Sequence, residues 1–208
     1  MTIVDLTIPL EAGMAHHPVH HGPGLEPYAR HEEGGWRATT ITLSSHLGTH
    51  VDAPSHYLAD GATLESLDID TLVGPAEVVR ISVTPSQALA PADLPATTGT
   101  RLLLHTGWAE QAAGEDRYFT EYPSISPALA HELIRRGVRL VGLDSPSVDY
   151  DPGETHHILL GAGVVIVENL IGLERLPDAV ELVVLPLPLV GGDGCPARAV
   201  ASFDGPSR

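Results

Sequence analysis

Imidazole and carboxylate side chains gather in one short segment, which reads His-Leu-Gly-Thr-His-Val-Asp-Ala-Pro-Ser-His over residues 46–56. In this segment His46, His50, Asp52 and His56 are each able to bind a metal ion or to carry a proton. Nitrogen and oxygen ligands together suit Zn²⁺ or Mn²⁺. Asp52 has two carboxylate oxygens and could bridge two ions. The segment therefore predicts a metal site.

A metal ion needs more ligands than one short segment easily supplies, so a second group is expected elsewhere. His156 lies in the segment Glu-Thr-His-His-Ile-Leu-Leu-Gly-Ala-Gly, and Glu168 closes the apolar run Val164–Val167. A carboxylate at the end of a buried strand is costly unless it is paired or bound to a metal. We therefore predict that His156 and Glu168 complete the site, with an ordinary ion pair as the alternative for Glu168. If His156 points inward, its neighbour His157 points elsewhere.

Short strands must position these residues. Gly48 and Pro54 oppose a helix over residues 46–56, so the expected setting is a loop that follows a strand. Several of the predicted strands are almost continuously apolar, which is typical of strands covered on both faces. The predicted strands are Ile3–Leu6, Ala38–Leu43, Glu77–Val83, Arg101–Thr106, Leu140–Leu143, Val164–Glu168, Val180–Leu185 and Ala197–Ser202.

Helices are fewer. Ser126 can cap a helix that has Pro127 in its first turn, and Gly137 suits the residue just past its end. A shorter helix is predicted from Thr155 to Leu160, and residues 84–99 are predicted as a surface loop. Many strands with few helices predict one α/β layered domain spanning residues 1–208.

Composition excludes several classes of function. The chain carries 11 basic and 27 acidic residues, a net charge of −16, which argues against nucleic acid or an anionic membrane as a partner. Every basic residue is arginine, so Schiff-base, P-loop and pyridoxal-phosphate chemistry are excluded. One cysteine, Cys195, fits a reducing compartment. Because neither a signal peptide nor a long apolar stretch is visible, we expect a cytoplasmic protein.

The motifs together resemble a known family. The pattern His46-x-Gly48-Thr49-His50-x-Asp52-x-Pro54-x-His56 is similar to the signature of metal-dependent cyclase-like hydrolases, which include bacterial kynurenine formamidases and isatin hydrolases. The likeness covers nearly the whole chain. It extends to Val4-Asp5-Leu6-Thr7, Leu103-Leu104-His105-Thr106-Gly107-Trp108, His156-x-x-Leu159-Leu160, Ile166-Val167-Glu168-Asn169-Leu170, Leu185-Pro186-Leu187, Gly191-Gly192-Asp193-Gly194 and Pro196-x-Arg198.

This resemblance implies a three-layer β/β/α domain of the swivelling type, in a homo-oligomer that is a dimer or a tetramer. It implies two Zn²⁺ ions, although other members of the family use a single Mn²⁺. The first ion would be bound by His46 and His50 and the second by His156. Asp52 would bridge the two ions and Glu168 would contact both, while His56 would act as the catalytic acid and base.

The resemblance also implies hydrolysis of a small aryl amide by a metal-activated water, with N-formyl-L-kynurenine, cleaved to L-kynurenine and formate, as the first candidate. The chain departs from the family's formamidases at His17, which stands where an aromatic residue is expected to stack on the substrate, and at Val19-His20, which replaces Gly-Asp. His17 is therefore predicted to bind substrate, in a polar loop that also contains His16, His20 and His21. Trp36, Trp108 or Tyr118 could supply aromatic walls instead.

Two other functions stay open at this point. One is a lactam hydrolase of the isatin hydrolase kind, or a tailoring enzyme or cyclase that acts in aromatic metabolite biosynthesis. The other is a metal-binding protein without catalysis, against which His56 argues, because a storage site needs no proton carrier beside its ligands.

Overall fold

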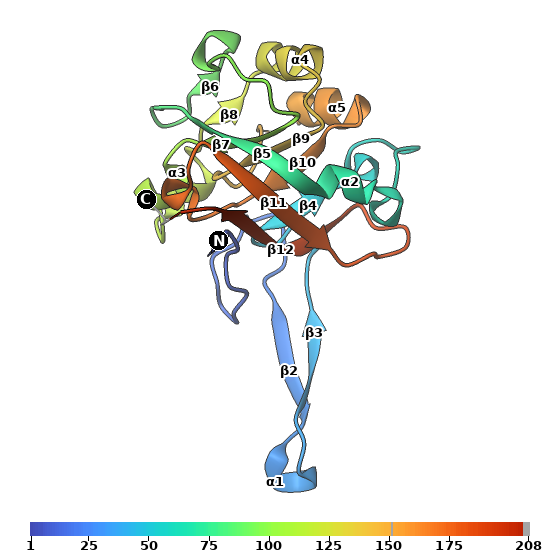
Figure 1. Ribbon diagram of the computed structural model, residues 1–208. Coiled ribbons are helices and arrows are strands. Elements are labelled where there is room, and N and C mark those ends of the chain that lie inside the picture. Colours follow the sequence, from blue (N-terminus) through green and yellow to red (C-terminus); the bar gives the residue numbers. More distant parts are fainter. Residues whose placement is uncertain (151, 206–208) are drawn as a thin grey trace.

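The computed structural model of the chain describes residues 1–150 and 152–205 (Figure 1). Within these residues, seven strands pair side by side around a closed ring, because β4 pairs with both β10 and β12. A further strand, β1 (Thr2–Asp5), pairs with β12. The ring consists, in spatial order, of β12 (Gly194–Phe203), β11 (Ala179–Pro186), β5 (Val73–Arg80), β7 (Arg101–His105), β9 (Leu140–Leu143), β10 (Val165–Glu168) and β4 (His50–Asp52).

The direction of the strands divides the ring into two parts. Strands β5, β7, β9 and β10 are parallel to their neighbours in that order, whereas β11, β12 and β4 pair antiparallel. The parallel strands are the near-continuous apolar runs of the sequence, and all four residues of β9 and of β10 are buried. Parallel strands need cover on both faces, and two separate hydrophobic cores provide it.

One core fills the ring and the other lies outside it. Leu103, Leu140 and Val167 point into the first core, and their strand neighbours Leu104, Val141 and Ile166 belong to the second. This division follows from the period of two residues along a strand. The second core is covered by helices α4 (Pro127–Arg135) and α5 (Glu154–Gly161), which lie together above β9 and β10 in Figure 1.

The predicted helices are confirmed. The Ser126 hydroxyl accepts a hydrogen bond from the Leu129 amide at 3.2 Å, and Gly137 has the positive φ of 77° that suits the residue after a helix. Helix α5 begins one residue earlier than predicted and ends at Gly161.

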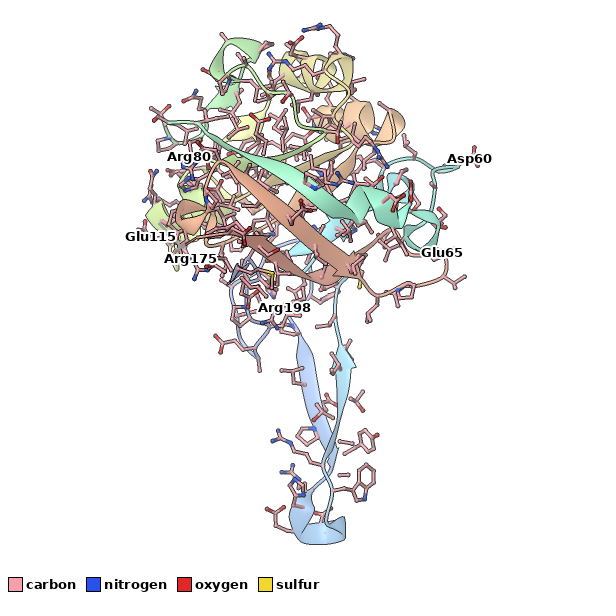
Figure 2. The ribbon with its side chains drawn as sticks, in the orientation of Figure 1. Asp60, Glu65, Arg80, Glu115, Arg175 and Arg198 are labelled. Carbon is pink, nitrogen blue, oxygen red and sulfur yellow. The ribbon has the colours of Figure 1, made fainter. Side chains whose placement is uncertain are left out.

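A hairpin arm, defined here as residues 24–42, projects away from the ring (Figure 1). It consists of β2 (Gly24–Ala29), the single turn α1 (His31–Gly34) and β3 (Ala38–Thr42), and β2 and β3 pair only with each other. Figure 2 shows its side chains extending into solvent on both sides. The strand predicted at Ala38–Leu43 therefore exists, but it stands outside the ring.

Two sequence-based expectations are wrong. Residues 50–52 form strand β4, not a loop, because β10 and β12 hydrogen-bond to the segment from either side. Residues 84–99 are not one loop, since β6 (Ala88–Leu89) pairs there with β8 (Ser124–Ile125). The remaining short elements are η1 (Pro54–His56), η2 (Leu64–Ser66), α2 (Ile69–Leu72), η3 (Pro91–Asp93), α3 (Trp108–Gln111), η4 (Asp116–Phe119) and η5 (Leu173–Arg175).

All eight predicted strand runs coincide with observed strands, with ends that differ by a few residues. The α/β class predicted from the sequence is confirmed, and the sheet closes on itself. No helix among the described residues is long and apolar enough to cross a membrane.

Candidate metal centre

The pairing of β4 with β10 positions three residues of the centre. His50 on β4 lies opposite Glu168 on β10, and Asp52 lies opposite Ile166. Because side chains alternate along a strand, His50 and Asp52 point to the same face while Val51, between them, packs into the core inside the ring. The local sequence His-Val-Asp therefore places an imidazole and a carboxylate next to the carboxylate that ends β10.

Two carboxylates are shared among the imidazoles. Asp52 Oδ1 lies 2.7 Å from His46 Nδ1 and 3.3 Å from His50 Nε2, whereas Asp52 Oδ2 lies 3.7 Å from His156 Nε2. The two carboxylate oxygens of Glu168 are arranged in the same way: Oε2 lies 3.4 Å from His50 Nε2, and Oε1 lies 3.4 Å from His156 Nε2. Each carboxylate thus presents one oxygen toward His50 and the other toward His156, which creates two adjacent sets of ligands.

The opposite nitrogen of each imidazole contacts an outer acceptor. His50 Nδ1 lies 2.8 Å from the carbonyl oxygen of Gly48, and His156 Nδ1 lies 2.6 Å from Asp149 Oδ1. Such contacts fix the ring and its tautomer, and they leave the inner nitrogen free to bind a metal ion. The conformation of Gly48, with φ of 61°, is the left-handed one that glycine adopts readily.

Asp149 also holds the start of α5. Its Oδ2 accepts hydrogen bonds from the amides of Thr155, at 2.6 Å, and of His156, at 3.2 Å. One carboxylate therefore fixes both the backbone and the ring of His156. Sequence analysis missed Asp149, because nothing in the sequence distinguishes it from other acidic loop residues.

The connection between β11 and β12 closes the other side of the centre. Asp193 Oδ2 lies 3.1 Å from His46 Nε2, and the Asp193 carbonyl accepts a hydrogen bond from the Ala53 amide at 2.9 Å. Gly194 follows, and a Cβ atom there would lie 2.5 Å from Cε1 of His46. Only glycine allows the imidazole to approach this closely. The sequence motif Gly191-Gly192-Asp193-Gly194 was noted above without a role for Asp193.

The buried charges strongly perturb one another. Burial alone would lower the pKa of His50, but Asp52 and Glu168 raise this pKa to about 10. Burial opposes ionisation of Asp52, yet the charge of His50 and hydrogen bonds from His156 and His46 hold the pKa of Asp52 well below its usual value. Burial likewise acts against the charged form of His156, but Asp149, Asp52 and Glu168 raise the pKa of His156 well above its usual value. Two anionic carboxylates thus concentrate positive charge in the centre.

A divalent cation fits these residues. Among the described residues, His50 Nε2 and Asp52 Oδ2 are buried polar atoms without a hydrogen-bond partner, and both face the shared space. Unpaired buried polar atoms are costly, and ligation satisfies them. His50, Asp52 and Glu168 offer ligand atoms within 4.8 Å of one another. Nitrogen and carboxylate donors in this combination suit Zn²⁺ or Mn²⁺.

His56 lies beside the cluster, at the end of the turn η1. Its ring stacks on that of His46 with centroids 3.7 Å apart, and its Nδ1 lies 3.9 Å from Asp193 Oδ2. Burial, together with the positive charges of His46 and His156, outweighs the nearby carboxylates and lowers the pKa of His56 to about 4. The side chain keeps 25% exposure, the largest in the cluster after Asp193, so it is open to a bound molecule. His56 also lies within ligand distance of His46 and Asp52.

A cavity of about 660 Å³ opens over the cluster. It is lined by His46, His50, His56, His156 and Glu168 together with residues of the N-terminal loop, α3, η4 and the segment 146–150. The six residues predicted for the metal site and its proton carrier are therefore brought together: five line the cavity, and Asp52 lies fully buried beneath it.

The predicted substrate residue His17 also lines this cavity, with its ring 6.1 Å from that of Phe119. Of the three aromatic alternatives, Tyr118 lines the cavity. The other two do not: Trp36 is exposed on the arm, and Trp108 is buried in a small core with Tyr118 and Tyr122. Tyr57, which the sequence analysis missed, stacks on His156 with centroids 4.4 Å apart.

Comparison with known proteins gives a consistent set of relatives. Residues 4–150 match the protein family described as "Putative cyclase". The chain is 38% identical over 191 residues to the kynurenine formamidase of Geobacillus thermodenitrificans, a match that covers 85% of this chain and 88% of that one.

Two solved structures resemble the whole fold. A predicted metal-dependent hydrolase from Bacillus stearothermophilus superposes with a TM-score of 0.80 at 29% identity, over 96% of this chain and 97% of that one. Isatin hydrolase A from Labrenzia aggregata superposes with a TM-score of 0.83 at 24% identity, over 96% and 93% of the two chains. The latter likeness concerns the fold alone.

Proposed function

We propose that this chain, which belongs to the Cyclase family, is a metal-dependent hydrolase of small aryl amides, with N-formyl-L-kynurenine as the first candidate substrate. One observation carries the proposal: Asp52 and Glu168 each present one carboxylate oxygen to His50 and the other to His156. The relatives named kynurenine formamidase support the choice of substrate.

We assign the metal ligands accordingly. His46 and His50 would hold a first ion and His156 a second, with Asp52 bridging and Glu168 contacting both. Zn²⁺ is the proposed metal, and a single Mn²⁺ is the alternative. Bound there, a divalent cation supplies Lewis-acid chemistry, which polarises a carbonyl oxygen and makes water easier to deprotonate.

The side chains around the ions do the remaining work. His56, the partly exposed imidazole at the edge of the cluster, would take a proton from the attacking water and return it to the leaving nitrogen. His17 and the aromatic walls would orient the aryl ring. Water is the proposed nucleophile, because the chain has no lysine and Cys195 is packed in the core inside the ring.

Hydrolysis of N-formyl-L-kynurenine by protein reconstituted with Zn²⁺ or, separately, with Mn²⁺ tests this proposal. The His156→Ala variant should lose the second ion and most of the turnover, as metal analysis and the release of formate would show. Protein that binds metal yet hydrolyses no aryl formamide would contradict the function.

A lactam hydrolase is the second candidate. His17, a smaller ring than the stacking aromatic expected in formamidases, favours a different aryl substrate in the same cavity. Side-by-side turnover of isatin and N-formyl-L-kynurenine separates the two activities.

We also propose that the chain is a homodimer in the cytoplasm and that the hairpin arm carries the contact. Tyr28 and Trp36 pair at the end of the arm with ring centroids 6.1 Å apart, and they are 66% and 54% exposed. An isolated two-stranded hairpin is marginally stable in water, and exposed apolar side chains favour a partner. Light scattering should find a dimer for the natural protein and a monomer for Trp36→Ser with Ile41→Ser.

The arrangement of layers is part of the same proposal. The ring encloses one core, and α4 and α5 cover a second core on its outer face. The two sides of the ring and the pair of helices outside it support a three-layer β/β/α description of a single domain over residues 1–208.

A further inference from the structure

Asn169, the only asparagine of the chain, follows Glu168 at the end of β10. Its φ of 58° is a left-handed backbone conformation, which is strained for residues other than glycine and least so for asparagine and aspartate. The only other such non-glycine residue in the described part of the chain, Ser86, lies in an exposed turn, whereas Asn169 is 6% exposed. A buried residue that keeps this strain beside the candidate metal centre points to a function for its side chain.

The positive φ sets the direction of the Asn169 side chain. Had β10 continued, the residue after Glu168 would point to the opposite face, into the core inside the ring. Glu168 and Asn169 instead both line the cavity. The backbone of this turn is held by two hydrogen bonds: the Asn169 amide donates to the Ser145 carbonyl at 3.0 Å, and the Thr49 hydroxyl donates to the Asn169 carbonyl at 2.6 Å. The strained residue is therefore fixed next to a proposed metal ligand.

One polar group of Asn169 is left for a ligand. Its side-chain oxygen, Oδ1, accepts a hydrogen bond from the Tyr118 hydroxyl at 2.9 Å. This buried hydroxyl has no other acceptor among the described residues, so it fixes Oδ1 toward Tyr118 and Nδ2 away from it. Nδ2 has no partner in the same part of the chain, and it is not one of the unpartnered atoms that are sealed from the cavity. The side-chain amide therefore offers an unused N–H donor to the cavity.

The other polar groups at the floor of the cavity already have roles. The carboxylates of Asp52 and Glu168 only accept hydrogen bonds, and the inner nitrogens of His50 and His156 face the proposed ions. A carbonyl oxygen that gains negative charge is stabilised by a fixed N–H donor in a site from which water is excluded. Asn169 supplies such a donor, one peptide unit from Glu168.

We propose that Asn169 Nδ2 donates a hydrogen bond to the oxygen of the scissile carbonyl group and stabilises the negative charge that this oxygen gains. The water oxygen bonds to the carbonyl carbon and its proton passes to His56, while the π electron pair moves onto the carbonyl oxygen. When that pair returns, the C–N bond breaks and the proton passes to the leaving nitrogen. Tyr118 is then a positioning residue, because its hydroxyl orients the amide. This inference rests on the proposed function and adds a catalytic residue to it.

Turnover of two formamides by Asn169→Gly tests the proposal. Glycine keeps the positive φ and removes the amide. Formanilide has the scissile group and the ring of N-formyl-L-kynurenine but lacks its ketone and its amino-acid side chain. For both substrates, kcat per bound metal ion should fall about 10²-fold while KM changes less than about threefold. An unchanged kcat, or a fall for N-formyl-L-kynurenine alone, would overturn the proposal, because the amide would then bind no substrate or only the ketone and side chain.

A matched pair of variants separates this catalytic role from a structural one. Tyr118→Phe removes only the hydroxyl that bonds Oδ1, and it should lower kcat less than Asn169→Gly does. Adding Asn169→Gly to Tyr118→Phe should lower kcat per bound metal ion by at least about a further tenfold. If Asn169 served only as the acceptor for the Tyr118 hydroxyl, the double variant would be as active as Tyr118→Phe, and the proposal would be wrong.

Binding of two anions tests Asn169 without turnover. Benzylphosphonate places a tetrahedral group with three oxygens where formanilide has its formyl group, and phenylacetate places a planar group with two. In calorimetric titrations of the Zn²⁺-loaded proteins, Asn169→Gly should weaken benzylphosphonate binding about tenfold and phenylacetate binding less than about threefold. Equal weakening of both anions, or of neither, would refute the assignment.

The two experiments also separate this inference from the function on which it rests. If the natural protein hydrolyses neither formamide while the two anions differ as expected, the formamidase activity is wrong and the role of Asn169 toward a carbonyl oxygen stands. If both formamides are hydrolysed and Asn169→Gly is as fast as the natural protein, the activity stands and the role of Asn169 is wrong.

Discussion

The ring and the arm are both made of short strands, yet they differ in what surrounds each strand. Strand β4, only three residues long, is hydrogen-bonded to β10 on one side and to β12 on the other, and all three of its residues are buried. Strand β3 has five residues and one partner, β2, and most of its length is exposed. Closure, more than strand length or composition, determines which segment becomes dry enough to hold a cluster of charges.

The largest contrast should come from the buried carboxylate that strand β4 presents on the outer face of the ring. Asp52→Asn keeps the volume of the side chain but removes the anion that His46, His50 and His156 share. We expect loss of bound metal and a fall in turnover of at least about 10³-fold, since several kcal/mol of transition-state stabilisation depends on the ion. His50→Ala should do the same. Metal analysis after gel filtration measures the first effect, and Glu32→Gln on the arm is the control that should retain metal.

The second-largest effect should distinguish the proposed proton carrier, His56, from the proposed metal ligands. His56→Ala should keep the metal content of the natural protein while turnover falls by about 10²–10⁴-fold, the range for loss of general acid–base catalysis. Because His56 also lies within ligand distance of His46 and Asp52, the metal content decides between the two roles. Loss of an ion in this variant would make His56 a ligand.

Substitutions of apolar side chains should also destabilise the fold much more in the ring than in the arm. Leu103 is fully buried inside the ring, and Leu103→Ala should lower the free energy of unfolding by about 2–5 kcal/mol. Ile41 is 61% exposed on the arm, and Ile41→Ala should change this free energy by less than about 0.5 kcal/mol in the monomer. Denaturant titrations at low protein concentration measure both. A large loss at Ile41 that grows with protein concentration would mean that a second chain covers the arm.

The smallest expected effect is a pH dependence of the stability, which arises from Glu132 on helix α4. Hydrogen bonds from Arg135 and Arg136 lower the pKa of Glu132 to about 2 from its usual 4.5. A carboxyl group with a lower pKa in the folded state adds stability above the unfolded value, and this contribution is lost as the pH falls from about 4.5 toward 2. The stability difference between the natural protein and Glu132→Gln should therefore shrink over that range. Denaturant titrations of both proteins over this pH range measure the difference, and a difference that does not change with pH would contradict the prediction.

Local signals account for what the sequence predicts well. His46, His50, Asp52 and His56 lie within eleven residues, so their grouping is visible without a fold. Helix α4 is predicted because its cap, its first-turn proline and its terminal glycine are neighbours in the sequence. His156 and Glu168 were found because each is a polar residue beside a strongly apolar run.

Long-range contacts account for what the sequence leaves out. His46 and Asp193 are 147 residues apart, and only closure of the ring brings them together. Three residues of β4 look like a loop until two neighbouring strands hydrogen-bond to them. Strand β2 of the arm was missed because Gly24 and Pro27 give it little strand propensity, and it is ordered by pairing with the antiparallel strand β3.

The double pairing of β4 also has a thermodynamic consequence. The strand that closes the ring carries two of the residues proposed to bind metal, so closing the ring and assembling the ligands are one event. A cation that binds only the closed form stabilises the whole fold by RT ln(1 + [M]/Kd), where [M] is the concentration of free metal. An ion bound there would hold the ring closed, so the concentration of free metal would set the stability of the folded chain as well as its activity.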